Sequence, residues 1–265
     1  MRTFSDLLKI GEGEDMLLGT WSQIGAPEVI DILGTCGFSF VILDAQHTSF
    51  SMQTVENMAR ACAANGLVPI VRVADNLPHL VLQARDIGAA AVVVPGISTR
   101  DAAEAAVCAA RFGPSGQRSA CPMVRSSGQF TADWRAYAKR CNAEPGVIAL
   151  VETPEGIGNC DRIATVPGIA AILAGPFDLA VAMGYDDDMR HPEVVSAMEK
   201  LLEAARRANI PLIMPIFAPA AKECREVMEE WKRRGVKLFT VGGDKLFLAD
   251  YVRRYVGQLR AQRES

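Results

Sequence analysis

The sequence predicts an α/β protein with the (β/α)8 TIM-barrel architecture, on three observations. Short apolar runs rich in β-branched residues alternate with segments whose apolar residues recur at helical spacing, in about eight such pairs. Continuous apolar strands joined by helices indicate a parallel sheet buried on both faces. The length of 265 residues suits one barrel, which typically takes about 250. We therefore expect one domain over residues 1–265.

In the first half of the chain, each apolar run is followed by a helix with recognisable ends. The expected strands are Met16–Trp21, Phe40–Leu43, Val68–Val73 and Ala91–Val94, and the expected helices are Pro27–Gly34, Met52–Ala64, Pro78–Ile87 and Asp101–Arg111. Proline begins two of these helices, at a position where its missing N–H is not needed. Asn65-Gly66 ends the second helix, because the residue after a helix often adopts a left-handed conformation that favours glycine. Ser98 or Thr99 can cap the fourth helix.

The second half repeats the pattern after a long loop at Phe112–Gln129, which is rich in glycine and proline. Long loops in compact domains tend to be functional. The expected strands are Val147–Val151, Ile169–Leu173, Pro211–Ile216 and Lys237–Val241, and the expected helices are Trp134–Cys141, Pro154–Ile163, Pro192–Ala208, Ala218–Arg234 and Lys245–Arg260. A doubly wound sheet is the alternative, but no G-x-G-x-x-G fingerprint follows any expected strand.

Composition excludes several classes of partner. The chain has 28 Lys and Arg against 31 Asp and Glu, and 6% aromatic residues, so neither a basic face nor a stacking platform for nucleic acid is expected. The seven cysteines are scattered and form no C-x-x-C pair, which favours free thiols in a reducing compartment. No apolar run approaches the ~18–20 residues that cross a bilayer, and no signal-peptide core is evident. We expect a cytoplasmic protein without a membrane partner.

Polar residues follow four of the expected strands, where a TIM barrel carries its catalytic groups. They are Asp44 and His47 after the second strand, Arg72 at the end of the third, Glu152 after the fifth and Asp178 after the sixth. Two carboxylates without a thiol favour a hard divalent ion such as Mg²⁺ or Mn²⁺. Arg72 could stabilise a developing enolate oxygen, and His47 could act as a general acid and base.

Structural interpretations of the same residues stay open. Glu152 and Asp178 could be acids in the first turn of a helix, where the helix dipole favours them. Arg72 could form a structural ion pair at the rim. Asp44 could be a turn residue, and His47 a loop residue.

Two further residues stand apart from this group. A Schiff-base mechanism would need a desolvated lysine, and only Lys245 lies near the expected rim. Asp86 lies near the C-terminal end of a helix, where the dipole disfavours a negative charge. It is either an acid that is solvated or lies next to Arg85, or a charge that orients another group, for which a subunit interface is one possible location.

The order and spacing of five motifs resemble the HpcH/HpaI aldolase family, from about Leu18 to the last helix. The motifs are Phe40-Val-Ile-Leu-Asp-Ala-Gln-His47, Pro69-Ile-Val-Arg-Val73, Gly113-Pro-x-Gly-x-Arg118, Val151-Glu-Thr153 and Ala174-Gly-Pro-Phe-Asp-Leu179. The resemblance implies a (β/α)8 barrel, a divalent metal ion (Mg²⁺, Mn²⁺ or Co²⁺), and a homohexamer with the last helix exchanged between subunits. It also implies reversible cleavage of 4-hydroxy-2-oxo acids, either 2-keto-3-deoxy sugar acids or 4-hydroxy-2-oxo diacids, to pyruvate and an aldehyde.

By the same resemblance, Glu152 and Asp178 match metal ligands, and Arg72 matches the arginine that binds the pyruvyl keto oxygen. The pyruvate carboxylate is expected on the backbone of a segment whose four residues are Gly175, Pro176, Phe177 and Asp178.

His47 and Asp86 match a dyad that handles the proton of the 4-hydroxyl group, with Asp86 expected to act on a neighbouring subunit. Asp44 matches a polar residue that supports the site. Two positions depart from the family pattern: Gln46 replaces a frequent glutamate, and Leu150 replaces a frequent glutamine.

Other functions on this scaffold are compatible with the same residues. A citrate-synthase-like or acyl-CoA lyase, or an oxaloacetate-type decarboxylase, would share the metal and the enolate. A non-catalytic metabolite-binding barrel is a third possibility.

For the aldolase interpretation, the loop from Arg118 to Arg125 is a candidate contact for the aldehyde end of the substrate.

Overall fold

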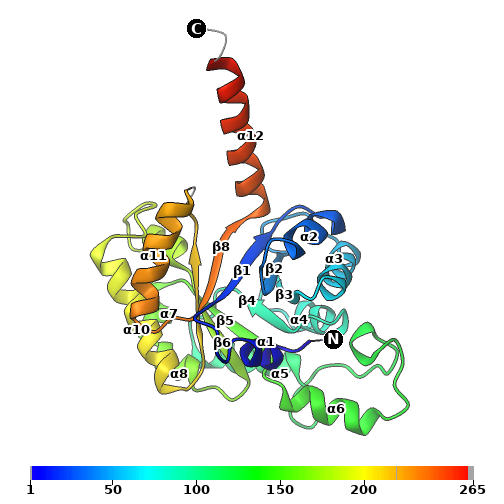
Figure 1. The fold of residues 1–265 in the computed structure, drawn as a ribbon. Coiled ribbons are helices and arrows are strands. Elements are labelled where there is room, and N and C mark those ends of the chain that lie inside the picture. The colour runs from blue at the N-terminus through cyan, green and yellow to red at the C-terminus, as the bar shows by residue number, and fades with distance from the viewer. Residues whose placement is uncertain (1, 219, 262–265) are drawn as a thin grey trace.

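The computed structural model, which describes residues 2–218 and 220–261, is a closed barrel of eight parallel strands surrounded by helices (Figure 1). The strands pair in chain order, and β8 closes the barrel against β1. Their bounds are β1 (Leu17–Ser22), β2 (Phe40–Asp44), β3 (Val68–Arg72), β4 (Ala91–Val94), β5 (Val147–Val151), β6 (Ile169–Ala174), β7 (Leu212–Ile216) and β8 (Leu238–Gly243). The predicted TIM-barrel fold is thus confirmed.

The chain has helices before, between and after its strands. They are α1 (Phe4–Ile10), α2 (Pro27–Gly34), α3 (Met52–Ala64), α4 (Pro78–Asp86), α5 (Arg100–Ala110), α6 (Trp134–Ala143), α7 (Pro154–Gly158), α8 (Cys160–Ala164), α9 (Pro176–Ala182), α10 (Pro192–Arg207), α11 (Ala221–Arg233) and α12 (Asp244–Ala261), with a short 3-10 helix, η1, at Arg125–Ser127. No helix in the described part of the chain is long and apolar enough to span a membrane.

Two apolar layers hold the barrel together, because successive residues of a strand face opposite sides of the sheet. On β2, Phe40 and Ile42 belong to the cluster inside the barrel, whereas Val41 and Leu43 pack with the surrounding helices. Phe40 occupies the interior next to Gly19, where a Cβ atom would come within 2.3 Å of its ring. The inner cluster thus fills the barrel and leaves its carboxyl end to carry the site.

Three helices differ from the sequence prediction. The chain begins with α1, whose buried Phe4 and Leu7 join the inner cluster at the end of the barrel opposite α12 (Figure 1). The helix expected over Pro154–Ile163 is divided into α7 and α8 at Asn159, after a glycine-rich segment that weakens a helix. The short helix α9 begins at Pro176, where no helix bounds were expected, and it places Asp178 in its first turn, which was one of the open interpretations of that residue.

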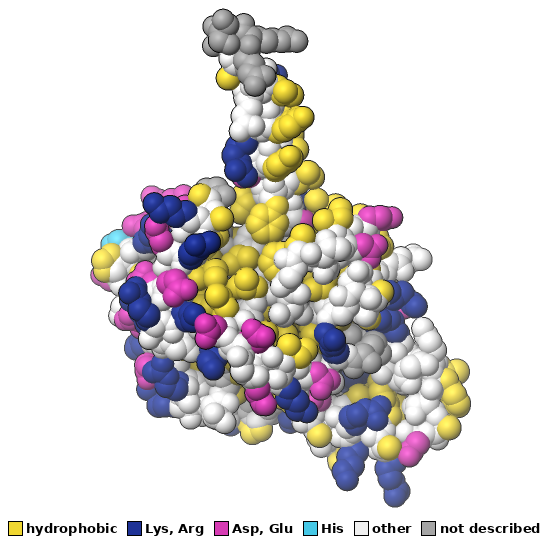
Figure 2. All heavy atoms as spheres, in the orientation of Figure 1, with side chains coloured by type: hydrophobic (Ala, Val, Ile, Leu, Met, Phe, Trp, Pro, Cys, Tyr) yellow, Lys and Arg dark blue, Asp and Glu magenta, His cyan; other side chains and the backbone are white. Residues whose placement is uncertain are grey.

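The last helix extends away from the barrel instead of packing on it (Figure 1). Figure 2 shows hydrophobic side chains along its length and at its base. The exposed ones recur at helical spacing and are Phe247, Leu248, Tyr251, Val252, Tyr255, Val256 and Leu259. An exposed apolar stripe of this kind commonly marks an interaction surface.

Candidate active site

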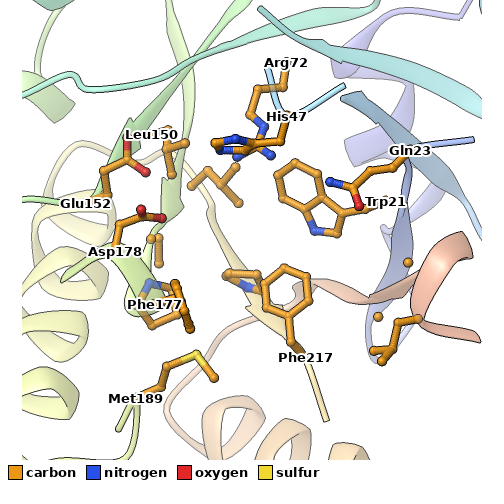
Figure 3. Close-up of a pocket in the computed structure, with 18 of the residues that line it drawn as sticks. Trp21, Gln23, His47, Arg72, Leu150, Glu152, Phe177, Asp178, Met189 and Phe217 are labelled. Atoms are coloured by element: carbon orange, nitrogen blue, oxygen red, sulfur yellow. The ribbon is translucent and has the colours of Figure 1, made fainter. Parts of the chain in front are cut away.

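A cavity of about 630 Å³ opens at the carboxyl ends of the strands. The polar groups that the sequence placed at four strand ends meet here: His47, Arg72, Glu152 and Asp178 all line it. Figure 3 shows the Glu152 and Asp178 carboxylates on one side of the cavity and Arg72 and His47 next to each other on another. The barrel therefore brings together residues that are more than a hundred positions apart in the chain.

Arg72, the last residue of β3, is held by Asp44, the last residue of β2. The Arg72 Nε atom donates to Asp44 Oδ1 at 2.9 Å, and Nη2 donates to Oδ2 at 2.7 Å. The two strands pair in register at these residues, so the backbone sets the bidentate geometry. Asp44 is fully buried. Burial raises its pKa, but the hydrogen bond and charge of Arg72 and a hydrogen bond from Gln23 lower it by more, so the pKa lies below its ordinary value.

The same carboxylate also orders the loop after β2. Its Oδ1 accepts hydrogen bonds from the backbone N–H groups of Gln46 and His47, at 3.0 and 3.2 Å. Gln46 itself does not line the cavity. Its buried Oε1 atom has no hydrogen-bond partner among the described residues. Asp44 thus contacts both Arg72 and the His47 loop, and its role in supporting the site stays a prediction.

Glu152 follows β5 and lies half-buried against the neighbouring loop. Its Oε1 atom accepts from the Gly96 N–H at 2.9 Å. Burial raises the pKa of Glu152, and the negative charge of Asp178 raises it further, against a lowering by Gly96 and Arg72. A cation between the two carboxylates would offset this repulsion.

Gly175 keeps the space beside Glu152 open. A Cβ atom at this position would come 2.4 Å from Glu152 Cβ and 3.2 Å from its Oε2 atom. The next residues begin α9, with Pro176 in its first turn. The N–H groups of the first helical turn have no partner within their helix, so those of Phe177 and Asp178 are available to a ligand.

Two carboxylates are a small donor set for a metal ion. No group of three or more His, Cys, Asp or Glu side chains suited to a metal ion occurs among residues 2–218 and 220–261. Mg²⁺ commonly takes one or two carboxylates and completes its shell with water and substrate oxygens. Glu152 and Asp178, both at the cavity, fit that pattern.

Asp86 and the two loop arginines lie elsewhere in the chain. Asp86 ends α4 and pairs with the buried Arg118, whose Nη2 atom donates to Asp86 Oδ1 at 2.6 Å. Arg125 donates from Nη1 to the Ile87 carbonyl oxygen at 2.6 Å. None of the three lines the cavity that His47 lines. Within one chain, the structure does not bring Asp86 or this loop to the site.

Sequence reasoning missed two polar residues at the rim. Gln23, after β1, donates from Nε2 to Asp44 Oδ2 at 2.7 Å and lines the cavity. Asp244, after β8, is buried and accepts from Ser22 Oγ at 2.8 Å and from the N–H groups of Gln23 and Ile24. Asp244 follows Gly242-Gly243 at the end of a strand, and this signal could have identified it.

An apolar wall completes the cavity and was also missed. Trp21 lies under the Arg72 guanidinium, 4.5 Å from Cζ to the ring centroid. Its ring centroid is 6.3 Å from that of Phe217. Met189 and Leu246 line the same region. An aromatic residue at the end of a strand can equally well belong to the hydrophobic core, so the sequence gives no clear sign that Trp21 and Phe217 line a cavity.

Comparison with known proteins finds related aldolases and a related barrel structure. The chain is 30% identical to 5-keto-4-deoxy-D-glucarate aldolase of Escherichia coli over 228 residues, 86% of each chain. It is 30% identical to 2-dehydro-3,6-dideoxy-6-sulfogluconate aldolase of Pseudomonas putida over 195 residues, 74% of this chain and 76% of the relative. A crystal structure of an HpcH/HpaI aldolase/citrate lyase family protein from Burkholderia cenocepacia superposes with a TM-score of 0.86 and 32% identity, over 97% of this chain and all of that one.

The family match covers most of the barrel. Residues 17–242 match the family described as HpcH/HpaI aldolase/citrate lyase, a span that runs from the first residue of β1 into β8. The chain therefore belongs to the HpcH/HpaI aldolase/citrate lyase family of carbon–carbon lyases.

Proposed function

We propose that this protein is a divalent-metal-dependent aldolase that reversibly cleaves a 4-hydroxy-2-oxo acid to pyruvate and an aldehyde. The observation that carries the proposal is the convergence of Glu152, Asp178, Arg72 and His47 on one cavity. The names of the two enzyme relatives, both keto-deoxy sugar acid aldolases, support the same reaction class.

Glu152 and Asp178 would hold the ion, with Mg²⁺, Mn²⁺ and Co²⁺ as the candidates. The space that Gly175 leaves beside Glu152 Oε2 suits this role. When bound, such an ion would polarise the keto oxygen of the substrate. The backbone N–H groups of Phe177 and Asp178 would bind the carboxylate of the same pyruvyl unit, next to the carboxylates that hold the ion.

Arg72 would stabilise the negative charge that develops on the keto oxygen as the enolate forms. Its pairing with Asp44 uses the Nε N–H and one N–H of Nη2, so the N–H groups of Nη1 and the second N–H of Nη2 are left for a substrate oxygen. The bidentate pair and the Trp21 ring beneath it fix the guanidinium before substrate arrives. A donor that needs no reorganisation during the reaction contributes most to the rate.

His47 would transfer the proton of the 4-hydroxyl group, since an imidazole can accept and donate a proton near neutral pH. In cleavage it removes that proton while the C3–C4 bond breaks, which leaves the aldehyde and the pyruvate enolate. Asp86 would orient His47 of a neighbouring copy, held by its ion pair with Arg118. The exposed apolar face of α12 supports an oligomer in which this helix packs on another copy, with a hexamer as the expected form.

Exchange of the pyruvate methyl protons in D₂O, followed by NMR with Mg²⁺ and with EDTA, tests the proposal. We expect metal-dependent exchange in the wild type and its loss in Arg72→Ala. Arg100→Ala is the matched control, because Arg100 is an exposed arginine that pairs with Glu104 on α5. No exchange with any of the three metals would exclude a pyruvate aldolase.

A further inference from the structure

The end of β1 contacts both members of the Asp44–Arg72 pair. The centroid of the Trp21 ring lies 4.5 Å from the Arg72 Cζ atom, and the Gln23 Nε2 atom donates to Asp44 Oδ2 at 2.7 Å. Residues two apart in an extended segment face the same side, and Figure 3 shows both side chains on one side of the cavity. The chain at the end of β1 therefore places an apolar ring on the arginine and a donor on its carboxylate partner.

The two oxygens of Asp44 have different sets of donors. Oδ1 accepts from Arg72 Nε and from the backbone N–H groups of Gln46 and His47. Within the described part of the chain, Oδ2 accepts from Arg72 Nη2 and Gln23 Nε2. Asp44 is fully buried, and a buried carboxylate that lacks donors is costly. Loss of the Gln23 carboxamide would leave Oδ2 with the arginine alone and free the carboxylate to turn.

The orientation of the Gln23 carboxamide follows from the charge of its partner. The pKa of Asp44 lies below its ordinary value, so this carboxylate is ionised at neutral pH and can only accept hydrogen bonds. The amide nitrogen therefore faces Asp44, as the structure shows. A neutral donor at position 23 suits an ionised partner, whereas a second carboxylate there would repel it.

The backbone at Gln23 is anchored by Asp244, the first residue of α12. The buried Asp244 carboxylate accepts from the Gln23 N–H at 3.0 and 2.9 Å and from the Ile24 N–H at 3.0 Å. The loop after β1 is thereby fixed, and it presents the Gln23 carboxamide to Asp44. All of these contacts lie within one chain.

We propose that Gln23 is a positioning residue of this enzyme, which holds the Asp44 carboxylate in the orientation that aims the remaining N–H groups of Arg72 at the substrate. The inference rests on the proposed function, in which Arg72 stabilises the enolate of pyruvate. A donor fixed in advance acts on the charge that develops in the transition state. Gln23 therefore affects the rate of enolate formation more than the binding of pyruvate.

Exchange of the pyruvate methyl protons in D₂O, with Mg²⁺-loaded full-length protein, measures enolate formation without an aldehyde. The result therefore does not depend on groups that another copy of the chain brings to the aldehyde end. Gln23→Met keeps the length of the side chain and removes its donor. We expect kcat for exchange to fall at least about tenfold, with KM for pyruvate within about threefold of the wild-type value.

Gln53→Met is the matched control, because Gln53 is exposed on α3 and does not line the cavity. It should keep the wild-type kcat and KM. A wild-type kcat in folded Gln23→Met overturns the inference. If KM alone rises in that variant, Gln23 binds pyruvate directly instead of acting through Asp44.

Gln23→Glu provides a second test that does not depend on how well Gln23→Met folds. A carboxyl group beside the ionised Asp44 has a raised pKa, because burial and the like charge disfavour its ionised form. While protonated it can donate to Asp44 as the amide does, and once ionised it repels Asp44. The kcat of this variant relative to wild type should be highest near about pH 5.5 and fall at least about tenfold by about pH 8.5.

Other titratable or charged side chains line the cavity with Gln23 or bond to its backbone, namely Arg72, His47, Glu152, Asp178, Asp187 and Asp244. They are the same in the wild type and in Gln23→Glu, so the ratio of the two proteins at each pH reports on position 23. A ratio that does not change with pH in the folded variant overturns the inference.

The wild-type assay separates the two levels of failure. Metal-dependent exchange in the wild type, with wild-type kcat in both Gln23 variants, overturns this inference alone. Absence of exchange in the wild type overturns the proposed function and this inference with it.

Discussion

Asp44 holds the Arg72 guanidinium by two parallel hydrogen bonds between the ends of adjacent strands, at 2.9 and 2.7 Å. The pair is buried, with Asp44 fully enclosed and 11% of the Arg72 side chain exposed. The same carboxylate also accepts a hydrogen bond from the backbone N–H of His47, so Asp44 contacts both of these cavity residues.

Replacing Asp44 by Asn should therefore destabilise the protein strongly. Breaking one partner of a buried pair leaves an uncompensated charge and costs about 3–5 kcal/mol. The pKa of Asp44 lies below its ordinary value in the folded state, so its contribution is complete above the unfolded pKa of about 3.9 and is lost as the pH falls through the folded pKa. Urea unfolding of wild type and Asp44→Asn should show the full difference at pH 7 and a smaller one below about pH 4.

Glu56→Gln is the control for that comparison, because Glu56 forms an exposed pair with Arg60 on α3. Exposed pairs contribute about 0–1 kcal/mol. Equal losses of stability in the two variants would contradict the assigned importance of the Asp44–Arg72 pair.

Glu152→Gln should abolish the rise in melting temperature that Mn²⁺ produces, because it removes one of two carboxylates proposed to hold the ion. Without metal, the variant should melt at or above the wild-type temperature, since burial and the Asp178 charge disfavour an ionised Glu152. Differential scanning calorimetry with and without Mn²⁺ measures both effects. Glu155→Gln, at an exposed glutamate of α7, should keep the full metal response; retention of that response by Glu152→Gln would exclude it as a ligand.

A methyl group at position 175 should damage the same site through shape alone. Gly175→Ala would push a Cβ atom against Glu152 Cβ, 2.4 Å away, and displace that carboxylate. We expect Mn²⁺ affinity to fall about 10–100-fold, the range seen when groups that orient metal ligands are lost. Isothermal titration calorimetry provides the value.

Gly158→Ala makes the same chemical change where a Cβ atom would meet nothing within 4 Å. Its Mn²⁺ affinity should match that of the wild type. If both alanine variants bound the ion normally, the space beside Glu152 would not matter for metal binding.

The exposed face of α12 should determine oligomeric state. Tyr255→Glu places a charge in the apolar stripe, where 53% of the tyrosine surface is exposed in one chain. Light scattering after gel filtration should show a smaller species than the wild type gives at the same concentration. Lys245→Glu, at an exposed residue of the same helix outside the stripe, should leave the mass unchanged; a monomeric wild type would refute the proposed assembly.

The eight strands could be predicted from the sequence because they are buried on both faces and read as continuous apolar runs. β4 and β5 begin and end at the predicted residues. The helix α9 could not be predicted, because its seven residues are too few to display a helical period. The one local sign of its start is Pro176 after a glycine.

The polar residues of the cavity could be predicted because each of them comes at or directly after the end of an expected strand. Arg72 and Glu152 lie where parallel strands end, and a barrel gathers all such ends at one rim. Gln23 was missed because its link to Asp44 is a contact between loops, which no local pattern records. The role proposed for Asp86 would require a second copy of the chain, and no local sequence motif records how two copies would meet.

Asp244 has a consequence for the order in which the protein matures. Its carboxylate accepts hydrogen bonds from Ser22 and Gln23, more than two hundred residues earlier in the chain. Synthesis proceeds from the N-terminus. The donors of the loop after β1 therefore cannot bond to the Asp244 carboxylate until nearly the whole chain has been synthesised. A chain that ends before β8 lacks both the strand that closes the barrel and the carboxylate that accepts from the Gln23 backbone N–H.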